Sequence, residues 1–199
     1  VGTTFIDDCQ WDRSGEYTTK GSVVVDTTNG KIVMPQSSGR ITKSNSFGDG
    51  FYECVISVSS VNSRPMFAIC AGDDSANIGT HEGKKYILYF TGGNKWRLYR
   101  NDGAGSAAYF SGDVPWVPTV NTKYRITLTK VGTEINFYID GIFMKTWVDA
   151  NPLPEGNAEI SSNYGEVTCY SLTVIAAEST STNGIAACIP PIGGGARYG

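Results

Sequence analysis

The stretch from Lys123 to Trp147 constrains the fold more than any other part of the chain. Apolar and polar residues alternate in it with a period of two, which is typical of strands that bury one face. Two turn signals interrupt the alternation. Gly132 can adopt a positive φ, and Asp140-Gly141 is a strong β-hairpin signal. Three antiparallel strands in one run form a meander, and meanders belong to β-sandwiches and barrels. The expected strands are Tyr124–Thr129, Glu134–Ile139 and Ile142–Trp147.

The remaining residues extend this all-β pattern. The chain has 199 residues, which suits one β-sandwich domain, and its 24 glycines, 12% aromatic residues and only 18% charged residues favour strands and turns over helices. No stretch shows a sustained apolar period of 3.6, so any helix is a single turn. The other expected strands are Thr4–Ile6, Ser22–Asp26, Lys31–Pro35, Arg40–Lys43, Gly50–Ser59, Arg64–Ala71, Lys85–Phe90, Lys95–Asn101, Ala107–Phe110, Asn157–Ser161 and Val167–Ile175.

Charge and hydropathy exclude two classes of partner. The formal net charge is −3 and the pI is near 5.2. Nucleic acids and anionic membranes bind to basic surfaces, so this acidic balance argues against both as partners. No apolar run approaches the roughly 18–20 residues that a membrane-spanning helix needs.

Particular segments carry a resemblance to a known family. Thr4-Phe-Ile-Asp-Asp-Cys9 followed by Trp11, Phe47-Gly-Asp-Gly-Phe-Tyr-Glu53 and Tyr138-Ile-Asp-Gly141 are similar to segments of the concanavalin A-like (laminin G-like) superfamily of lectins and glucanases. The resemblance spans about Thr4 to Ile175. It implies a two-sheet antiparallel β-sandwich of the jelly-roll type over residues 1–175, and it points to glycan recognition or glycan chemistry.

Catalysis has weak support in the sequence. The glucanases of this superfamily carry Glu-x-Asp-x-x-Glu on one strand, which places the nucleophile and the general acid on one face, and that motif is missing here. The Arg-rich and Gln-x-His strand motifs of its polysaccharide lyases are missing too, and the single histidine, His81, stands in a Gly- and charge-rich loop. Acidic residues on strands are isolated, and only convergence across strands would pair them. They are Glu53, Glu134, Asp140, Glu159 and Glu166.

Binding has better support. Residues 85–90 and 95–101 resemble the paired central strands of the concave face in this superfamily. Alternation puts Arg97, Tyr99 and Asn101 on one face, and flat aromatic rings beside planar polar groups suit sugars. For any single residue the alternative is ordinary core packing or a solvated side chain. The candidate ligand-binding residues are Tyr86, Tyr89, Arg97, Tyr99 and Asn101, with Tyr109 and Trp116 as a second rim.

Five cysteines without CxxC spacing and one histidine argue against a zinc site. An odd number allows at most two disulfides. Because the first and last strands are often neighbours in the superfamily, the resemblance implies a Cys9–Cys169 bridge. Cys54 and Cys70 form either a second bridge or two buried thiols.

The resemblance also implies a structural calcium ion, since this superfamily often binds one through oxygen ligands. Asp7-Asp8 and Asp73-Asp74 offer paired carboxylates. Neither pair lies in a contiguous calcium loop, so a solvated turn is the alternative for both. No other cofactor is expected.

Residues 176–199 differ from the rest of the chain. They begin small and polar, contain an apolar patch, and end rich in glycine. One interpretation is a linker or disordered tail. The other is an arm that docks on its own body or on a neighbouring subunit through Ile185, Cys188, Ile189 and Ile192.

Together these observations favour a non-catalytic, lectin-like module that binds a polysaccharide or glycoprotein glycan outside the cell or on a surface. The alternative is a structural subunit of an extracellular or viral assembly, in which the arm contacts copies of the chain. A polysaccharide-degrading enzyme ranks third. Because the sequence begins at Val1, we expect it to follow either a cleaved signal peptide or a longer chain.

Overall fold

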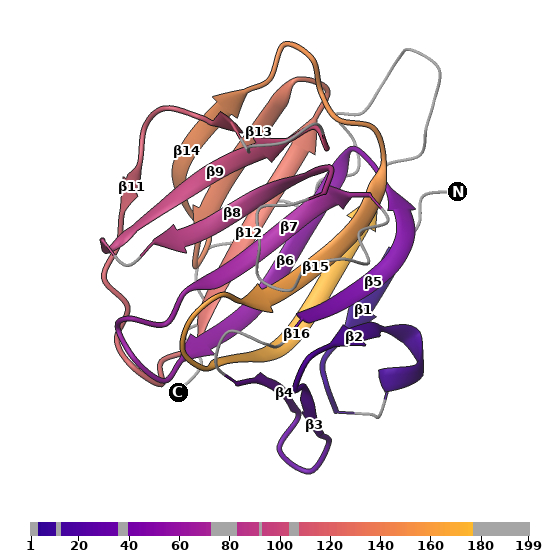
Figure 1. The fold of residues 1–199 in the computed structure, drawn as a ribbon, viewed down its shortest axis with the longest axis vertical. Coiled ribbons are helices and arrows are strands. Elements are labelled where there is room, and N and C mark those ends of the chain that lie inside the picture. The colour runs from indigo at the N-terminus through magenta and orange to yellow at the C-terminus, as the bar shows by residue number, and fades with distance from the viewer. Residues whose placement is uncertain are drawn as a thin grey trace.

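Two antiparallel β-sheets, A and B, pack face to face (Figure 1). They belong to a computed structural model that describes residues 4–10, 13–35, 40–72, 83–91, 93–103 and 108–176. Sheet A has the order β14-β13-β12-β6-β16-β4-β3, with β1 beside β16, and sheet B has the order β10-β9-β8-β7-β15-β5-β2, with β11 beside β9. Sheet A contains β1 (Thr4–Asp7), β3 (Val24–Asp26), β4 (Lys31–Met34), β6 (Gly50–Val58), β12 (Tyr124–Val131), β13 (Glu134–Ile139), β14 (Ile142–Val148) and β16 (Val167–Ala176). Sheet B contains β2 (Thr18–Lys20), β5 (Arg40–Phe47), β7 (Pro65–Ala71), β8 (Lys85–Thr91), β9 (Lys95–Asn101), β10 (Ala108–Tyr109), β11 (Val114–Pro115) and β15 (Gly156–Ser162).

The predicted two-sheet antiparallel sandwich is therefore confirmed. The meander forms β12, β13 and β14, and its second turn has a positive φ at both central residues, 51° at Asp140 and 79° at Gly141, as a two-residue hairpin requires. β1 pairs with β16, so the first and last strands are neighbours. The sequence did not reveal β2 and β11, because three and two residues are too short to show alternation.

One single-turn 3-10 helix, η1 (Ser14–Glu16), is found among the described residues. In this part of the chain no helix has the length and hydrophobicity needed to cross a membrane. β16 ends at Ala176, so the expected arm residues Ile185, Cys188, Ile189 and Ile192 lie outside the described part.

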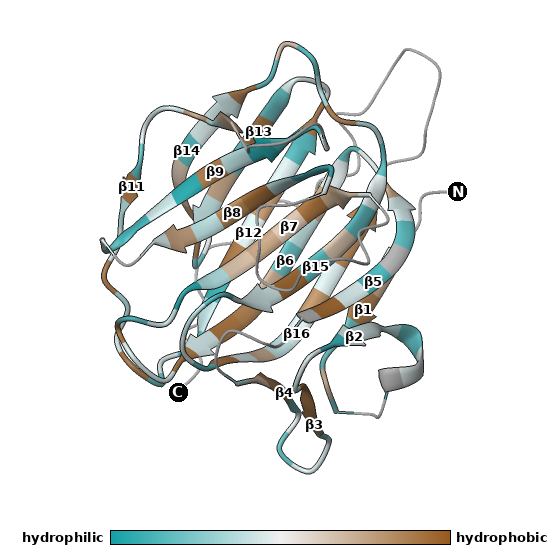
Figure 2. Cartoon of the chain, in the orientation of Figure 1, coloured by the Kyte–Doolittle hydropathy of each residue, from teal (hydrophilic) through white to brown (hydrophobic). Residues whose placement is uncertain are grey.

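The core lies between the sheets and is rich in aromatic rings. Trp96 is fully buried and packs against Phe90 and Phe137 at ring-centroid distances of 5.4 and 5.8 Å. Phe137 in turn stacks on Trp147 at 6.0 Å. Figure 2 shows apolar and polar bands alternating along the strands, which is how each sheet presents one face to this core. The core thus joins the meander of sheet A to the central strands of sheet B.

The predicted Cys9–Cys169 and Cys54–Cys70 bridges are absent from this structure, whereas the alternative for Cys54 and Cys70, two buried thiols, is confirmed. Cys9, Cys54, Cys70 and Cys169 are all buried free thiols. Cys9 and Cys169 do lie side by side, and a hydrogen bond between them, with burial, raises the pKa of the Cys169 thiol well above its usual value. Cys54 lies on β6 and Cys70 on β7, in different sheets, and burial raises the pKa of Cys70 to about 11. All four behave as small apolar core groups.

Candidate ligand-binding face of sheet B

The face of sheet B that points away from sheet A is unusually apolar at its centre. On β8, alternation turns Tyr86 and Leu88 towards the core and Ile87 and Tyr89 outwards. The outward pair packs with two residues of β7 in a separate buried cluster, and Tyr99 packs against it. We call these four residues the outer cluster: Met66, Ala68, Ile87 and Tyr89.

A buried ion pair lies on the same face. Lys85 Nζ is 3.1 Å from Glu159 Oε2, and the Thr42 hydroxyl donates to the other carboxylate oxygen at 3.5 Å. Both charged side chains are almost completely buried. Asn101 pairs with Lys85 across β8 and β9 and is buried as well. Removing two charges from water is costly unless they are paired and hydrogen-bonded, and here they are.

Three tyrosines form a row across this face. The ring centroids of Tyr89 and Tyr99 are 6.1 Å apart, and those of Tyr99 and Tyr109 are 6.0 Å apart. Asn163 donates a hydrogen bond to the Tyr89 hydroxyl at 2.9 Å. The accessibility increases along the row, from buried Tyr89 to Tyr109, which is 49% exposed on the edge strand β10. We call Tyr89, Tyr99 and Tyr109 the tyrosine row.

Arg97 lies beside the exposed end of this row. Its guanidinium carbon is 5.1 Å from the centroid of the Tyr109 ring. Its Nε and Nη2 donate to the two oxygens of Asp113 at 2.7 and 3.1 Å, and Lys95 Nζ approaches the same carboxylate at 2.6 Å. The bonds from Arg97 and then Lys95 hold the pKa of Asp113 at about 2. The arrangement places charged donors and acceptors next to a flat aromatic surface.

The structure thus brings most of the predicted ligand-binding residues to one face and separates two of them. Tyr89, Arg97, Tyr99, Asn101 and Tyr109 lie on or beside the outer face of sheet B. Whether they bind a ligand remains a prediction.

The predicted positions of Tyr86 and Trp116 on the ligand-binding face need correction. Tyr86 is buried in the core, where its hydroxyl donates to Asp149 at 2.7 Å and accepts from the Leu153 amide at 2.8 Å. Trp116 packs into the edge of the core, 5.0 Å from Phe90 and 4.8 Å from Tyr124 by ring centroids. Both rings are therefore used in packing the sandwich.

Sequence reasoning missed the outer cluster and the ion pair. The alternation along β8 could have placed Lys85 with Ile87 and Tyr89. Glu159, however, comes from β15, about seventy residues later, and no local sequence pattern predicts that it pairs with Lys85.

The isolated carboxylates do not converge into a glycosidase pair among the described residues. Glu53 lies between core residues Tyr52 and Cys54 of β6, so it points outwards from sheet A, and burial raises its pKa. Glu159 points outwards from sheet B, on the opposite side of the sandwich. Glycosidases need two carboxyl groups within about 10 Å that flank one bond. Glu134, Asp140 and Glu166 lie on sheet A or in turns.

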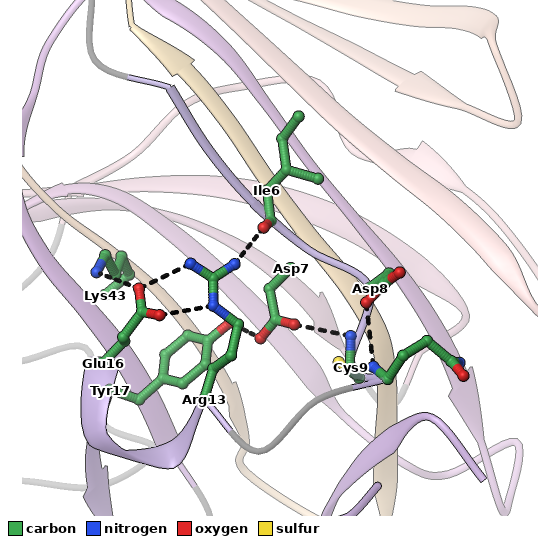
Figure 3. A network of polar contacts seen from close by, with 9 residues as sticks. Ile6, Asp7, Asp8, Cys9, Arg13, Glu16, Tyr17 and Lys43 are labelled. Carbon is green, nitrogen blue, oxygen red and sulfur yellow. Dashed lines mark hydrogen bonds and ion pairs between the residues drawn. The ribbon is translucent and has the colours of Figure 1, made fainter. Parts of the chain in front are cut away.

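Asp7 and Asp8 also point in different directions (Figure 3). Asp7 is buried and accepts hydrogen bonds from the Cys9 amide and the Tyr17 hydroxyl, whereas Asp8 is exposed and accepts one from the Gln10 amide. They therefore form no carboxylate pair for a calcium ion. Within the described residues, no group of three His, Cys, Asp or Glu side chains is arranged to hold a metal. Asp73, Asp74 and His81 lie outside those residues.

Figure 3 shows the hydrogen bonds and ion pairs that hold this N-terminal segment in place. Arg13 donates to both oxygens of Glu16 at 2.7 and 2.8 Å and to the Ile6 carbonyl. Arg13 and Lys43 both lie over the ring of Phe5, at 4.8 and 4.5 Å. The network is structural, because its donors and acceptors pair with one another.

Two open cavities lie on the surface of the sandwich. One of about 180 Å³ adjoins the exposed end of the tyrosine row, between Tyr109, Arg100 and Asn151. A larger one of about 610 Å³ lies at the turns after β6 and β15, and exposed Tyr164 is its aromatic wall, with Ser60, Asn62 and Glu166 around it. The smaller cavity is below the usual range for a small-molecule site, whereas the larger one lies within it.

No protein-family model matches the sequence, and no curated protein matches it significantly. Among solved structures, the carbohydrate binding module CBM66 from Bacillus subtilis has a TM-score of 0.65 and 16% identity, covering 81% of this chain and 96% of that one. Beta-glucanase from Bacillus licheniformis has a TM-score of 0.67 and 13% identity, covering 89% and 100%. Galectin LEC-6 of Caenorhabditis elegans has a TM-score of 0.53 and 16% identity, covering 73% and 96%. Identities this low show the fold alone: the chain has the concanavalin A-like jelly-roll fold that its sequence resemblance predicted.

Proposed function

We propose that the chain is a non-catalytic glycan-recognition module that binds a sugar chain at the exposed end of the tyrosine row. The observation that carries the proposal is the set formed by Tyr99, Tyr109, Arg97 and Asp113. Sugar C–H faces stack on aromatic rings, and sugar hydroxyls need both donors and acceptors. Because Asp113 already pairs with Arg97 and Lys95, the set suits a neutral, hydroxyl-rich ligand better than an anionic one.

The absence of catalysis is inferred from the carboxylates. Glu53 and Glu159 lie on opposite sides of the sandwich, and Glu159 is held in an ion pair with Lys85. The names of two structures with this fold describe carbohydrate binding or a lectin, and a third names a glucanase. The separation of Glu53 from Glu159 favours binding over catalysis by these two residues. Release of reducing sugar ends from a polysaccharide panel would overturn this part of the proposal.

Substitution of the exposed tyrosine tests the site. A glycan array with the unmodified chain identifies a ligand, and calorimetry then compares Tyr109→Ala with it. We expect binding to weaken about fivefold, since stacking contributes on the order of 1 kcal/mol and a tenfold change would need about 1.4 kcal/mol. Phe143→Ala is the matched control, because Phe143 is a similarly exposed ring on sheet A.

The outcomes of this test are distinct. Equal affinity of Tyr109→Ala and the unmodified chain would remove the tyrosine row from the site. Loss of binding in Tyr164→Ala instead would move the site to the 610 Å³ cavity. An array with no signal at any glycan would count against a lectin-like function altogether.

A second candidate function, a subunit of an assembly, is favoured by the edge of sheet A. β14 is the last strand of that sheet, and Ile142, Phe143 and Val148 are all exposed on it. An exposed apolar edge strand is a template for pairing with another chain. Light scattering over a dilution series tests this candidate: we expect larger particles that Phe143→Lys disperses and Tyr109→Ala does not. A monomer at every concentration would refute it.

A further inference from the structure

The larger of the two open cavities lies apart from the tyrosine row, and its walls are joined by backbone hydrogen bonds. It lies between the turn that links β6 to β7 and the turn that links β15 to β16. The Arg64 amide donates to the Tyr164 carbonyl at 2.6 Å, and the Asn163 amide donates to the Arg64 carbonyl at 3.0 Å. The Ser59 amide donates to the Glu166 carbonyl at 3.3 Å. Because these bonds fix the two turns to each other, the cavity is a preformed feature of the fold.

Close packing of the two turns depends on Gly165, which lines the cavity. Its φ is +68°, and a Cβ at this position would lie 2.5 Å from Ser63 Oγ and 2.9 Å from Ser63 Cα. Ser63 is completely buried. Within the described part of the chain, neither Ser63 Oγ nor the buried Nε of Arg64 has a hydrogen-bond partner. Buried polar atoms without a protein partner are uncommon and costly, so the turn behind this wall keeps unused hydrogen-bonding capacity.

Tyr164 gives the cavity a flat aromatic surface. Its side chain is 55% exposed, and the guanidinium carbon of Arg64 lies 5.4 Å from the centroid of its ring. This cation–π contact favours one orientation of the ring. Ser60 and Asn62 add a hydroxyl and an amide to the same lining. An aromatic ring beside small polar groups is the combination that a sugar needs for its C–H face and its hydroxyls.

Glu166 sets the charge of the cavity. Among the described residues that line it, Glu166 alone is charged. Its backbone carbonyl accepts from Ser59, whereas its carboxylate makes no ion pair or hydrogen bond within the described chain. Asp113 beside the tyrosine row differs, because Arg97 and Lys95 both pair with it. An unpaired carboxylate attracts a cationic ligand and repels an anionic one.

We propose that this cavity is a second sugar-binding site, selective for a sugar that carries an ammonium group. The sugar ring stacks on Tyr164, its hydroxyls bond to Ser60 and Asn62, and its ammonium group pairs with Glu166. The tyrosine row suits a neutral ligand, so the two sites differ in the charge that they select. The cavity site does not depend on glycan binding at the tyrosine row.

Two probes with the same sugar backbone test the charge selection. A chitosan oligosaccharide carries ammonium groups, and its fully N-acetylated counterpart is neutral. Calorimetry is carried out on the Tyr109→Ala chain, so that the proposed site on sheet B contributes little. We expect the ammonium form to bind about fivefold more tightly than the neutral form, as a partly exposed ion pair allows. In Glu166→Gln we expect the two probes to bind equally.

Glu134→Gln is the matched control for this substitution. Glu134 is exposed on β13, outside the cavity lining, and its replacement changes the net charge of the chain by the same amount. We expect this control to keep the fivefold preference. Equal loss of the preference in Glu134→Gln would overturn the proposal, because the net charge of the protein would then explain it.

Substitution of the ring tests whether the ligand is held as a sugar. Tyr164→Ala should weaken the binding of both probes about fivefold, whereas Tyr164→Phe keeps the ring and should bind as before. The backbone bonds between Arg64 and the opposite turn involve no side chain of residue 164, so both variants retain them. Unchanged binding in Tyr164→Ala would overturn the proposal.

The remaining outcomes identify the site that fails. Retention of the ammonium preference in Glu166→Gln, or no binding of either probe, would overturn the proposal. Cyclohexylamine that binds as tightly as glucosamine would overturn it too, since the cavity would then take organic cations in general. If Tyr109→Ala abolishes neutral-glycan binding and Glu166→Gln has no effect on either probe, the tyrosine row stands and the cavity site fails. The reverse result would leave the cavity site and remove the tyrosine row.

Discussion

The outer faces of the two sheets differ sharply. Sheet A presents a ladder of short polar side chains, in which Thr127 donates to Glu53 at 2.9 Å and Thr146 donates to Asn136 at 2.5 Å. Its charged pair, Arg125 with Glu53, is partly exposed at 3.4 Å. Sheet B presents a buried apolar cluster, a fully desolvated ion pair and a row of tyrosines.

The difference shows that the outer faces of the two sheets are stabilised in different ways. A threonine ladder satisfies a solvated sheet face and needs no partner. On sheet B, burial of apolar side chains is favourable, whereas burial of the Lys85 and Glu159 charges is costly unless they stay paired. The glycan site that we propose at the tyrosine row lies on sheet B, beside this buried region.

The largest expected effect comes from breaking the buried ion pair. Lys85→Met removes the cation that is paired with the buried Glu159 carboxylate, which should lower the free energy of unfolding by about 3–5 kcal/mol. Lys85→Met/Glu159→Leu should recover most of that loss. Arg125→Met removes the partner of Glu53 on sheet A, and we expect a loss within about 1 kcal/mol there. Urea denaturation measures all three. Equal losses in both single variants would erase the contrast between the faces.

Truncating one isoleucine on each face gives an intermediate effect. Ile87→Ala should cost about 2–4 kcal/mol, because the side chain is fully buried and its removal leaves a cavity. Ile175→Ala, on the outer face of sheet A, should cost about 1 kcal/mol or less, because that side chain is only half-buried. Thermal or urea unfolding of the two variants checks the ratio. A loss at Ile87 as small as that at Ile175 would contradict the greater burial of the sheet B face.

The smallest effect is electrostatic: a carboxyl group on each face titrates at a different pH. The pKa of Asp113 is lowered from 3.8 to about 2 by Arg97 and Lys95, so its stabilising pairing holds above its unfolded pKa and is lost as the pH falls through about 2. The pKa of Glu53 is raised by burial above 4.5, so its contribution is favourable below that value and is lost as the pH rises through its folded pKa. Carboxyl NMR should show Glu53 taking up its proton first. Protonation of Asp113 before Glu53 would contradict the assignment of the Arg97 pair.

Particular residues show how well the local sequence pattern predicted strands and faces. The alternation from Tyr124 to Thr129 and the Asp140-Gly141 turn placed the meander within two residues of its bounds. The same alternation placed Arg97, Tyr99 and Asn101 on one face. It failed for Tyr86, which the sequence grouped with the ligand-binding face although its position on β8 is opposite in phase to that of Tyr89.

The sequence by itself determined all the strands except β2 and β11, the all-β class and the resemblance to the concanavalin A-like fold, because period-two alternation and turn residues act within a few neighbours. Only the tertiary structure decided what meets on sheet B. Lys85 and Glu159 are brought together by strand order, and the tyrosine row is built from β8, β9 and β10. Cys9 and Cys169 likewise become neighbours through the pairing of β1 with β16, yet remain two thiols. Contacts across many strands depend on register and sheet order, which local sequence does not encode.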